Sequence, residues 1–241
     1  MIKKIKTYFE YKKDLKNLIQ QKGNDKAFPF GKFRPILNEK HAESGIASGH
    51  YFHQDLLIAR KIFENKPTKH VDIGSRTDGF VAHVASYREI EVFDIREQEN
   101  KIKNIIFKRA DLTKLTPDLI GYCDSISSLH AIEHFGLGRY GDSIDYNGHL
   151  KALANIEQIL QKGGRFYFST PIGPQRIEFN AHRVFSVRYL LDLFEPKYYM
   201  DSFSFVDDAG NLHEDVSLSS NDIDNNFGCS YGCGIFELTK K

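Results

Sequence analysis

Cysteine is scarce in this sequence, and neither sign of charge is in excess. The 241 residues include 3 cysteines, and the formal net charge is +1 at pH 7. So few cysteines, odd in number and without a signal peptide, indicate a protein of the reducing cytoplasm. A balanced charge provides no field that attracts nucleic acid, and no apolar run is long enough to span a bilayer. We therefore expect a cytoplasmic protein with no nucleic-acid partner and no integral membrane association.

The metal-binding patterns in the sequence are incomplete. Cys229 and Cys233 have the close spacing of half a metal site, but no second pair of ligands accompanies them. Residues 130–134, His-Ala-Ile-Glu-His, match a zinc-protease pattern that requires both histidines on one helix and a third ligand elsewhere. Here the pattern follows an apolar strand. We therefore expect no zinc at His130 and His134, and we assign no metal site.

A nucleoside-binding pattern is present at residues 70–94. It predicts a short apolar strand at 70–73, a turn that Gly74 opens, a helix after Gly79 and a second strand at 91–93 that stops at Asp94. This order is typical of a βαβ unit in which the acidic residue holds a ribose diol. Arg76 stands where a pyrophosphate-binding loop has its second glycine. The pattern therefore favours a nucleoside without pyrophosphate over a nicotinamide dinucleotide.

Predicted strands and helices alternate over the rest of the chain. Further strands are predicted at residues 105–107, 122–129, 165–171, 198–206 and 234–238. Helices are predicted at residues 149–161 and 187–194, where apolar residues recur every three or four positions. This alternation predicts an α/β fold with a doubly wound, mostly parallel sheet.

The first 67 residues are predicted to form a helical segment apart from an α/β domain at residues 68–241. Residues 1–22 have apolar residues at helical spacing and lysines on the other face. Such a helix either packs against the domain with its lysines in solvent or touches a membrane surface or an acidic partner. A second amphipathic helix is predicted over residues 51–63. We expect this segment to act as a lid, with Tyr51 and His53 as substrate contacts.

The predicted strand at residues 122–129 runs into polar residues that suit acid–base chemistry. Glu133 and His134 follow it, at the sheet edge where ligands bind in doubly wound folds. A neutral imidazole oriented by a carboxylate can take a proton from a hydroxyl near neutral pH. His134 is therefore the first candidate for a base, Glu133 orients it or positions a cofactor, and His182 is the next candidate.

A glycine-rich loop is predicted at residues 135–148, next to this pair. Long loops at the ligand edge of a compact domain are more often functional than not. Arg139, Tyr140 and Asp142 offer directed hydrogen bonds and an aromatic face. These side chains indicate a polyhydroxylated acceptor.

Over about residues 68–241 the sequence resembles the class I S-adenosylmethionine-dependent methyltransferases. Their first motif is an acidic residue, one residue and a glycine, which Asp72 and Gly74 match. Asp111 occupies the place of the acidic residue that meets the adenine amino group in those enzymes, although it also fits a helix N-cap. Asp-Ile-Gly-Ser-Arg at 72–76 and His-Ala-Ile-Glu-His-Phe-Gly-Leu-Gly-Arg-Tyr-Gly-Asp at 130–142 resemble a little-characterised methyltransferase-like family of bacteria and nematodes.

This resemblance implies a Rossmann-like methyltransferase fold with an antiparallel last strand, S-adenosylmethionine as cofactor, and O-methylation of a small polar acceptor such as a sugar or glycan precursor. The alternative is a non-catalytic module that binds a nucleoside or a protein, which the altered glycine loop favours. A homodimer is compatible with either. The implied cofactor-binding residues are Asp72, Gly74, Ser75, Arg76, Asp94, Ile95, Asp111, Leu112 and His130.

Overall fold

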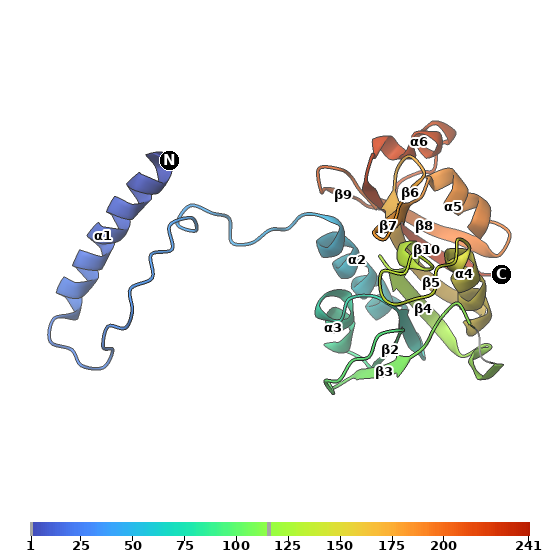
Figure 1. The fold of residues 1–241 in the computed structure, drawn as a ribbon, viewed down its shortest axis with the longest axis horizontal. Helices are drawn as coiled ribbons and strands as arrows, with labels where there is room; N and C mark the ends of the chain where they lie inside the picture. The colour runs from blue at the N-terminus through green and yellow to red at the C-terminus, as the bar shows by residue number, and fades with distance from the viewer. Residues whose placement is uncertain (1, 115–116) are drawn as a thin grey trace. The chain divides into compact units, whose positions relative to one another are not determined.

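The computed structural model of the chain describes residues 2–114 and 117–241 (Figure 1). The contacts within it divide the chain into two units, Met1–Ala47 and Ser48–Lys241. Across the described residues, no helix combines the length and the apolar character needed to cross a bilayer.

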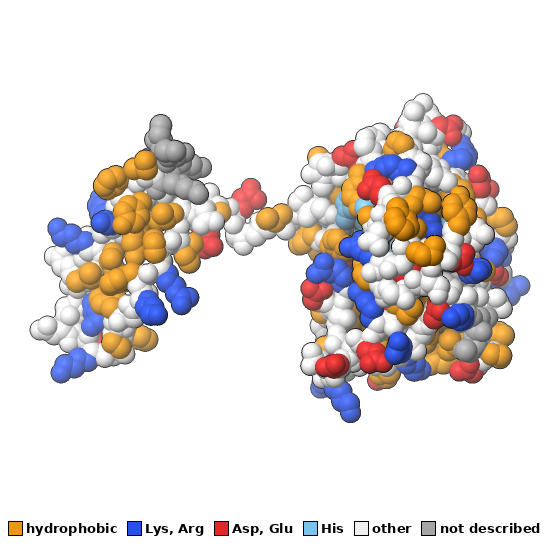
Figure 2. Space-filling view, in the orientation of Figure 1, with side chains coloured by type: hydrophobic (Ala, Val, Ile, Leu, Met, Phe, Trp, Pro, Cys, Tyr) orange, Lys and Arg blue, Asp and Glu red, His pale blue; other side chains and the backbone are white. Residues whose placement is uncertain are grey.

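The first unit is a helix with an irregular segment folded along it. Helix α1 (Ile2–Lys22) spans 21 residues. Leu15 and Ile19 of the helix line a shallow hollow together with Phe33 of the following segment. Lys40 Nζ binds Asp14 Oδ2 at 2.7 Å, which ties that segment to the helix. Figure 2 shows hydrophobic side chains gathered along this unit, with lysines around them.

The second unit is built on an eight-stranded sheet with the order β3-β2-β1-β4-β5-β10-β8-β9. Its strands are β1 (His70–Ile73), β2 (Ile90–Asp94), β3 (Ile105–Arg109), β4 (Cys123–Leu129), β5 (Leu160–Ile172), β8 (Tyr198–Val206), β9 (Leu212–His213) and β10 (Gly232–Lys240). Strands β1 to β5 are parallel, whereas β10 is antiparallel to both neighbours, β5 and β8. The expected doubly wound, mostly parallel sheet with an antiparallel last strand is confirmed.

Alternate side chains of the strands pack into two cores. Phe166 and Phe168 of β5 belong to the core under α4 (Gly148–Ile159) and α5 (Val187–Phe194), whereas Tyr167 belongs to the other core. Successive strand residues point to opposite faces, which explains the division. Figure 1 shows α4 and α5 on one side of the sheet and α2 and α3 on the other. Each enclosed apolar side chain contributes about 1.5–3 kcal/mol to stability.

Helix α2 (His50–Asn65) belongs to the second unit. Its side chains Leu57, Ile58 and Ile62 share a core with residues of η1 (Thr77–Val81) and α3 (Ala82–Ala85). The sequence placed this helix in an N-terminal segment that ends at residue 67. The contacts place the division before Ser48 instead, because the apolar face of α2 covers the sheet. That the N-terminal segment acts as a lid stays a prediction.

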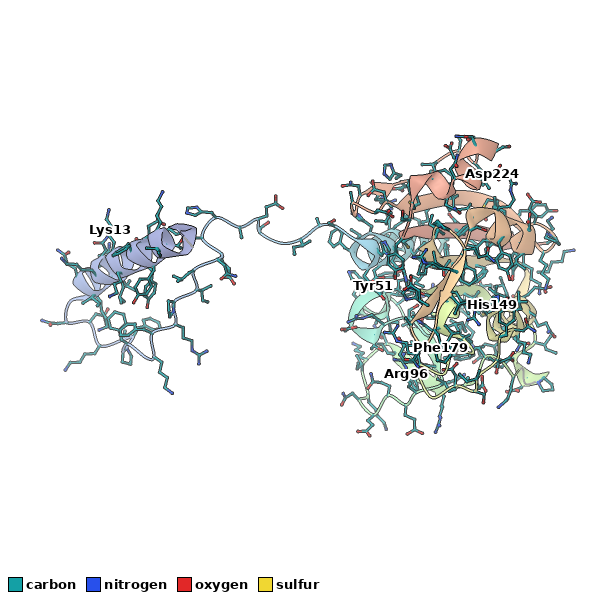
Figure 3. All side chains as sticks on the ribbon, turned by 45° about the horizontal axis from the view of Figure 1, so that its top comes forward. Lys13, Tyr51, Arg96, His149, Phe179 and Asp224 are labelled. Carbon is teal, nitrogen blue, oxygen red and sulfur yellow. The ribbon has the colours of Figure 1, made fainter. Side chains whose placement is uncertain are left out.

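Several short elements near the ends of the strands have no clear signal in the sequence. They are β6 (Arg176–Glu178), β7 (His182–Val184), α6 (Ser220–Asp224), η2 (Pro117–Leu119), η3 (Ile132–His134) and η4 (Asn226–Gly228). Strands β6 and β7 form an antiparallel hairpin. The hairpin turn carries the exposed Phe179, which Figure 3 labels along with Tyr51 of α2 and Arg96 after β2.

Candidate functional site

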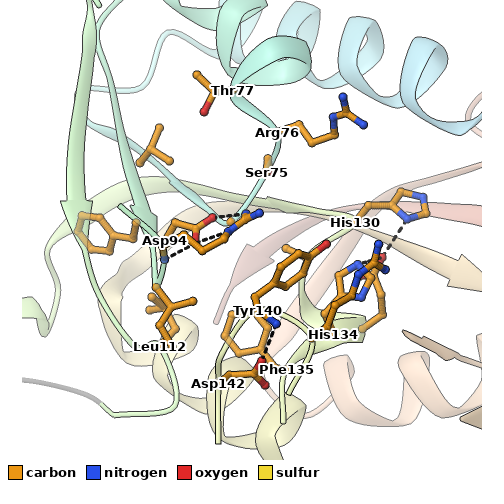
Figure 4. A pocket seen from close by; sticks show the side chains of 18 of the residues that line it. Ser75, Arg76, Thr77, Asp94, Leu112, His130, His134, Phe135, Tyr140 and Asp142 are labelled. Atoms are coloured by element: carbon orange, nitrogen blue, oxygen red, sulfur yellow. Dashed lines mark hydrogen bonds and ion pairs between the residues drawn. The ribbon is translucent and has the colours of Figure 1, made fainter. Parts of the chain in front are cut away.

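A cavity of about 860 Å³ lies at the carboxyl ends of β1, β2 and β4 (Figure 4). Parallel strands end at a common edge, so the topology gathers there the residues that follow each strand. All but two of the candidate residues from the sequence line it: Tyr51, Gly74, Ser75, Arg76, Asp94, Ile95, Asp111, Leu112, His130, Glu133, His134, Arg139, Tyr140, Asp142 and His182. The two that do not are His53 and Asp72.

Asp72 shapes the first turn from behind the cavity wall. Its carboxylate is fully buried and accepts hydrogen bonds from the Ser75 amide at 2.9 Å, the Ser75 hydroxyl at 2.7 Å and the Ser127 hydroxyl at 2.6 Å. Burial raises the pKa of Asp72 to about 6. Gly74 follows with a φ of 70°, which favours glycine. The acidic residue of this motif therefore holds the turn in place and does not itself face the cavity.

Asp94 ends β2 and faces the cavity, but its carboxylate already has a partner. Arg96 Nε lies 3.0 Å from one carboxylate oxygen and Nη2 lies 2.6 Å from the other. The Arg96 guanidinium also lies over the Tyr140 ring, 4.3 Å from its centroid. A ribose diol at Asp94 therefore competes with Arg96 or shares the carboxylate with it. The sequence analysis did not single out Arg96, which lies only two residues after Asp94.

Asp111 holds a turn while lining the cavity. It accepts hydrogen bonds from the Thr113 amide at 3.1 Å and the Thr113 hydroxyl at 2.7 Å. Residues 112–114 form a turn and a bend, so Asp111 caps a turn. Both roles that the sequence suggested, capping and contact with a ligand, are open to a carboxylate placed in this way.

Glu133 pairs with His130. Its Oε1 lies 2.9 Å from His130 Nδ1 and 3.8 Å from His134 Nε2, and its side chain is 1% exposed. Burial alone would lower the pKa of His130, but the charges of Cys233 and Glu133 outweigh burial and raise it. The sequence predicted that Glu133 orients His134. The closer partner of Glu133 is instead His130, which lies three residues earlier in the chain.

His134 is oriented by the backbone of the hairpin. Its Nδ1 lies 2.6 Å from the carbonyl oxygen of Ala181, so Nδ1 carries the proton that this bond requires. Nε2 is then the nitrogen that can accept a proton. Burial lowers the pKa of His134, which favours the neutral ring. The His182 ring lies 6.4 Å from the His134 ring, and its Nε2 lies 3.3 Å from Glu178.

The loop after η3 is held by side chains that the sequence assigned to substrate. Asp142 accepts hydrogen bonds from the amides of Gly136 at 2.8 Å and Gly138 at 3.2 Å. Arg139 donates to the Ala181 carbonyl at 3.1 Å. Tyr140 lies edge-on to the His134 ring, 5.3 Å away. Tyr140 is thus the loop residue best placed beside a substrate, whereas Asp142 organises the loop itself.

Arg183 is a structural residue of the site that sequence reasoning missed. It is 4% exposed and donates to the carbonyls of Phe135 at 2.6 Å and Tyr146 at 3.0 Å. It thereby joins the hairpin to the loop. A single arginine in a polar segment gives no signal of this contact, which arises from tertiary structure alone.

Comparison with known sequences identifies the family. The family described as "Caenorhabditis protein of unknown function, DUF268" matches residues 79–228. This chain belongs to the DUF268 family. The match includes Asp94, Glu133, His134 and His182, while the turn at 72–76 and strand β10 lie outside it. No curated protein matches the sequence of this DUF268 protein.

Solved structures show which fold the DUF268 protein has. It is similar to 1,6-didemethyltoxoflavin-N1-methyltransferase of Burkholderia thailandensis, crystallised with S-adenosylhomocysteine, at 13% identity and a TM-score of 0.55 over 78% of each chain. It is also similar to the N-methyltransferase NodS of Bradyrhizobium japonicum WM9, crystallised with S-adenosylhomocysteine. The sequence identity is 11% and the TM-score is 0.51, over 80% of this chain and 88% of NodS. A third similar structure is the [4+2]-cyclase SpnF, with a sequence identity of 11% and a TM-score of 0.54 over 78% of this chain and 80% of SpnF. The fold is that of the class I methyltransferases, and the cyclase shows that it also supports another reaction.

Proposed function

We propose that this DUF268 protein transfers a methyl group from S-adenosylmethionine to an oxygen of a small polar acceptor, such as a sugar or glycan precursor, in the cytoplasm. We also take the DUF268 family to be the one that segments 72–76 and 130–142 resemble. One observation carries the proposal. A single cavity has nucleoside-binding groups at the ends of β1, β2 and β3, and a histidine that presents Nε2 after β4.

The residues at the first three strands fit a nucleoside without pyrophosphate. Asp94 supplies a carboxylate for ribose hydroxyls, and Asp111 supplies one for the adenine amino group. Ile95 and Leu112 offer apolar surface for the base. A cavity of about 860 Å³ falls within the range of about 300–1,000 Å³ that ligand pockets occupy. When bound there, S-adenosylmethionine supplies an electrophilic methyl group.

His134 is the group placed to take a proton from the acceptor. The Ala181 carbonyl fixes the Nδ1–H tautomer, so Nε2 accepts the proton of the acceptor hydroxyl. Glu133, with Oε1 at 3.8 Å from Nε2, stabilises the imidazolium that results. Tyr140 lies beside His134 and offers an aromatic contact for the acceptor, on a ring that the Arg96 guanidinium also covers. We thus assign base, charge stabilisation and acceptor position to three different side chains.

Two contacts favour a second function, a module that binds a nucleoside or protein without turnover. Arg96 occupies both carboxylate oxygens of Asp94. Arg76, at the place of a loop glycine, forms an ion pair with Asp78 at 2.8 Å. Both arginines weaken the case for tight cofactor binding. The two functions differ in whether the bound methyl group is ever transferred.

Binding of S-adenosylmethionine, measured by calorimetry with NAD as the comparison, tests the cofactor. Asp94→Ala should weaken the affinity by about 1.5–3 kcal/mol, because charge-assisted hydrogen bonds to the ribose are lost. Asp192→Ala, an exposed change on α5, is the matched control and should leave the affinity unchanged. Binding of NAD in place of S-adenosylmethionine, or equal affinity in the Asp94 variant, would contradict this assignment.

Turnover on a panel of sugars and nucleotide sugars tests the chemistry. His134→Ala should lower the rate about a hundredfold to ten-thousandfold with cofactor saturating, as is usual for loss of a general base. Its affinity for S-adenosylmethionine should stay within a few-fold of wild type. His53→Ala, which does not line the cavity, is the control. Retained turnover in the His134 variant would make His182 the next candidate, and tight cofactor binding without any turnover would favour the second function.

A further inference from the structure

Three side chains that suit a transition metal meet next to the cavity, which one of them, His130, lines. His50 begins α2, His130 follows β4, and Cys233 lies on β10. One potential ligand atom from each lies within 4.8 Å of those of the other two. In a tetrahedral zinc site with bonds of about 2.0–2.3 Å, such atoms are about 3.3–3.7 Å apart. The three atoms are therefore within about 1.5 Å of the separations that one shared ion requires.

One ring nitrogen of His130 has no hydrogen-bond partner in the part of the chain that the structure describes. Its Nδ1 is engaged by Glu133 at 2.9 Å, and its side chain is 5% exposed. Its Nε2 is buried and has no hydrogen-bond partner among residues 2–114 and 117–241. A buried polar atom left in this state is destabilising. A histidine that donates one ring nitrogen to a carboxylate and leaves the other free is the arrangement of a metal ligand with its outer-shell carboxylate.

His50 and Cys233 complete the donor set. The His50 ring stacks on the His130 ring, with centroids 5.3 Å apart. Cys233 is fully buried, and its Sγ lies 3.6 Å from the Gln54 side-chain oxygen. An ion bound here would displace the proton of the Cys233 thiol and take the sulfur as a thiolate ligand.

We propose that His50, His130 and Cys233 bind one divalent transition metal ion of the zinc class. Two imidazole nitrogens and one thiolate favour zinc over magnesium or calcium, which prefer oxygen ligands. Three protein ligands leave one position of a tetrahedral site for an oxygen ligand, which the cavity can supply because His130 lines it. The ion would join α2, the end of β4 and β10. This site goes beyond methyl transfer and does not depend on it.

Cobalt substitution tests the site directly. Full-length protein is freed of metal with a chelator and titrated with Co²⁺, and absorption by the thiolate-to-cobalt bond and by tetrahedral cobalt is recorded. Wild type should bind one equivalent and show both signals. Cys233→Ser should lose the thiolate signal, and His50→Ala should bind at least tenfold more weakly. Cys229→Ser is the matched control, because this buried cysteine is four residues away and outside the cluster, and it should bind as wild type does.

Thermal unfolding with and without Zn²⁺ gives a second readout that is independent of activity. Zinc should raise the Tm of wild type and of Cys229→Ser but not that of His50→Ala. If Cys233→Ser fails to fold, the effect of zinc on the Tm of His50→Ala decides the question by itself, because His50 is partly exposed. Less than a tenth of an equivalent bound at micromolar Co²⁺ would overturn the proposal, as would equal loss of the thiolate signal in both cysteine variants. Neither result bears on S-adenosylmethionine binding, so the two proposals fail separately.

Discussion

Replacing His70 is expected to make the protein more resistant to acid. His70 begins β1 and is 1% exposed. Its Nδ1 lies 2.8 Å from the Ser125 hydroxyl and its Nε2 lies 3.1 Å from the Ser127 hydroxyl. Burial and, to a smaller extent, the charge of Arg88 together lower the pKa of His70 from its ordinary value of 6.5 to about 3. The folded protein therefore keeps this ring neutral at a pH where the unfolded chain protonates it.

The sign and size of the effect follow from these two pKa values. Between pH 6.5 and 3 the unfolded chain binds more protons than the folded protein at this residue, so the free energy of unfolding falls as the pH falls. Stability from the neutral ring is fully present above pH 6.5. Linkage arithmetic gives a loss of about 3 kcal/mol on going from pH 7.5 to 4, on the order of a third of a typical domain's stability.

Urea unfolding at a series of pH values, followed by circular dichroism, measures this loss. His70→Gln keeps hydrogen-bonding groups between the two serines but does not titrate in this range. It should start less stable at pH 7.5 and lose about 3 kcal/mol less than wild type by pH 4. His83→Gln, an exposed change, should follow wild type throughout. A His70→Gln curve that falls as steeply as that of wild type would refute the reasoning.

Two further substitutions probe the cofactor side of the cavity. Gly74→Ala should lower the free energy of unfolding by about 1 kcal/mol, because its φ is 70° and an added Cβ would lie 3.1 Å from Ala131 Cβ. Urea unfolding checks this, and unchanged stability would show that the turn adjusts. Arg96→Ala should tighten S-adenosylmethionine binding several-fold, because it frees the Asp94 carboxylate. Calorimetry checks this, and weaker binding would show that Arg96 contacts the nucleoside instead.

The sheet could be predicted from the sequence because the side chains of its strands pack into two cores, one on each face. Phe166, Tyr167 and Phe168 alternate between the faces, and long apolar runs of this kind are characteristic of strands covered on both sides. The β6–β7 hairpin could not be predicted, because three residues per strand give too little alternation. The sequence also could not show that α2 packs with the second unit. An amphipathic pattern shows that a helix buries one face but not what covers it.

Most of the residues that line the candidate site could be predicted from the sequence, but the contacts between their side chains could not. Asp94, Asp111 and Glu133 each lie just after a parallel strand, and that position alone brings them to one edge. Their partners depend on side-chain direction. Glu133 pairs with His130 rather than with its neighbour His134. The reason is that residues three apart meet across a tight turn, as in a 3₁₀ helix. Arg183, in the same way, reaches the loop only once the hairpin has formed.

The position of β10 has a consequence for how the chain folds as it is made. Residues 232–240 lie between β5 and β8, so these two strands have no common neighbour until that segment has left the ribosome. Strands β1 to β5 can pair earlier, but β5 then presents an open edge over residues 165–172, with which β10 pairs in the full chain. A nascent chain that stalls before residue 232 exposes this edge and lacks Cys233. We expect such a chain to be a client of chaperones and proteases rather than a smaller folded domain.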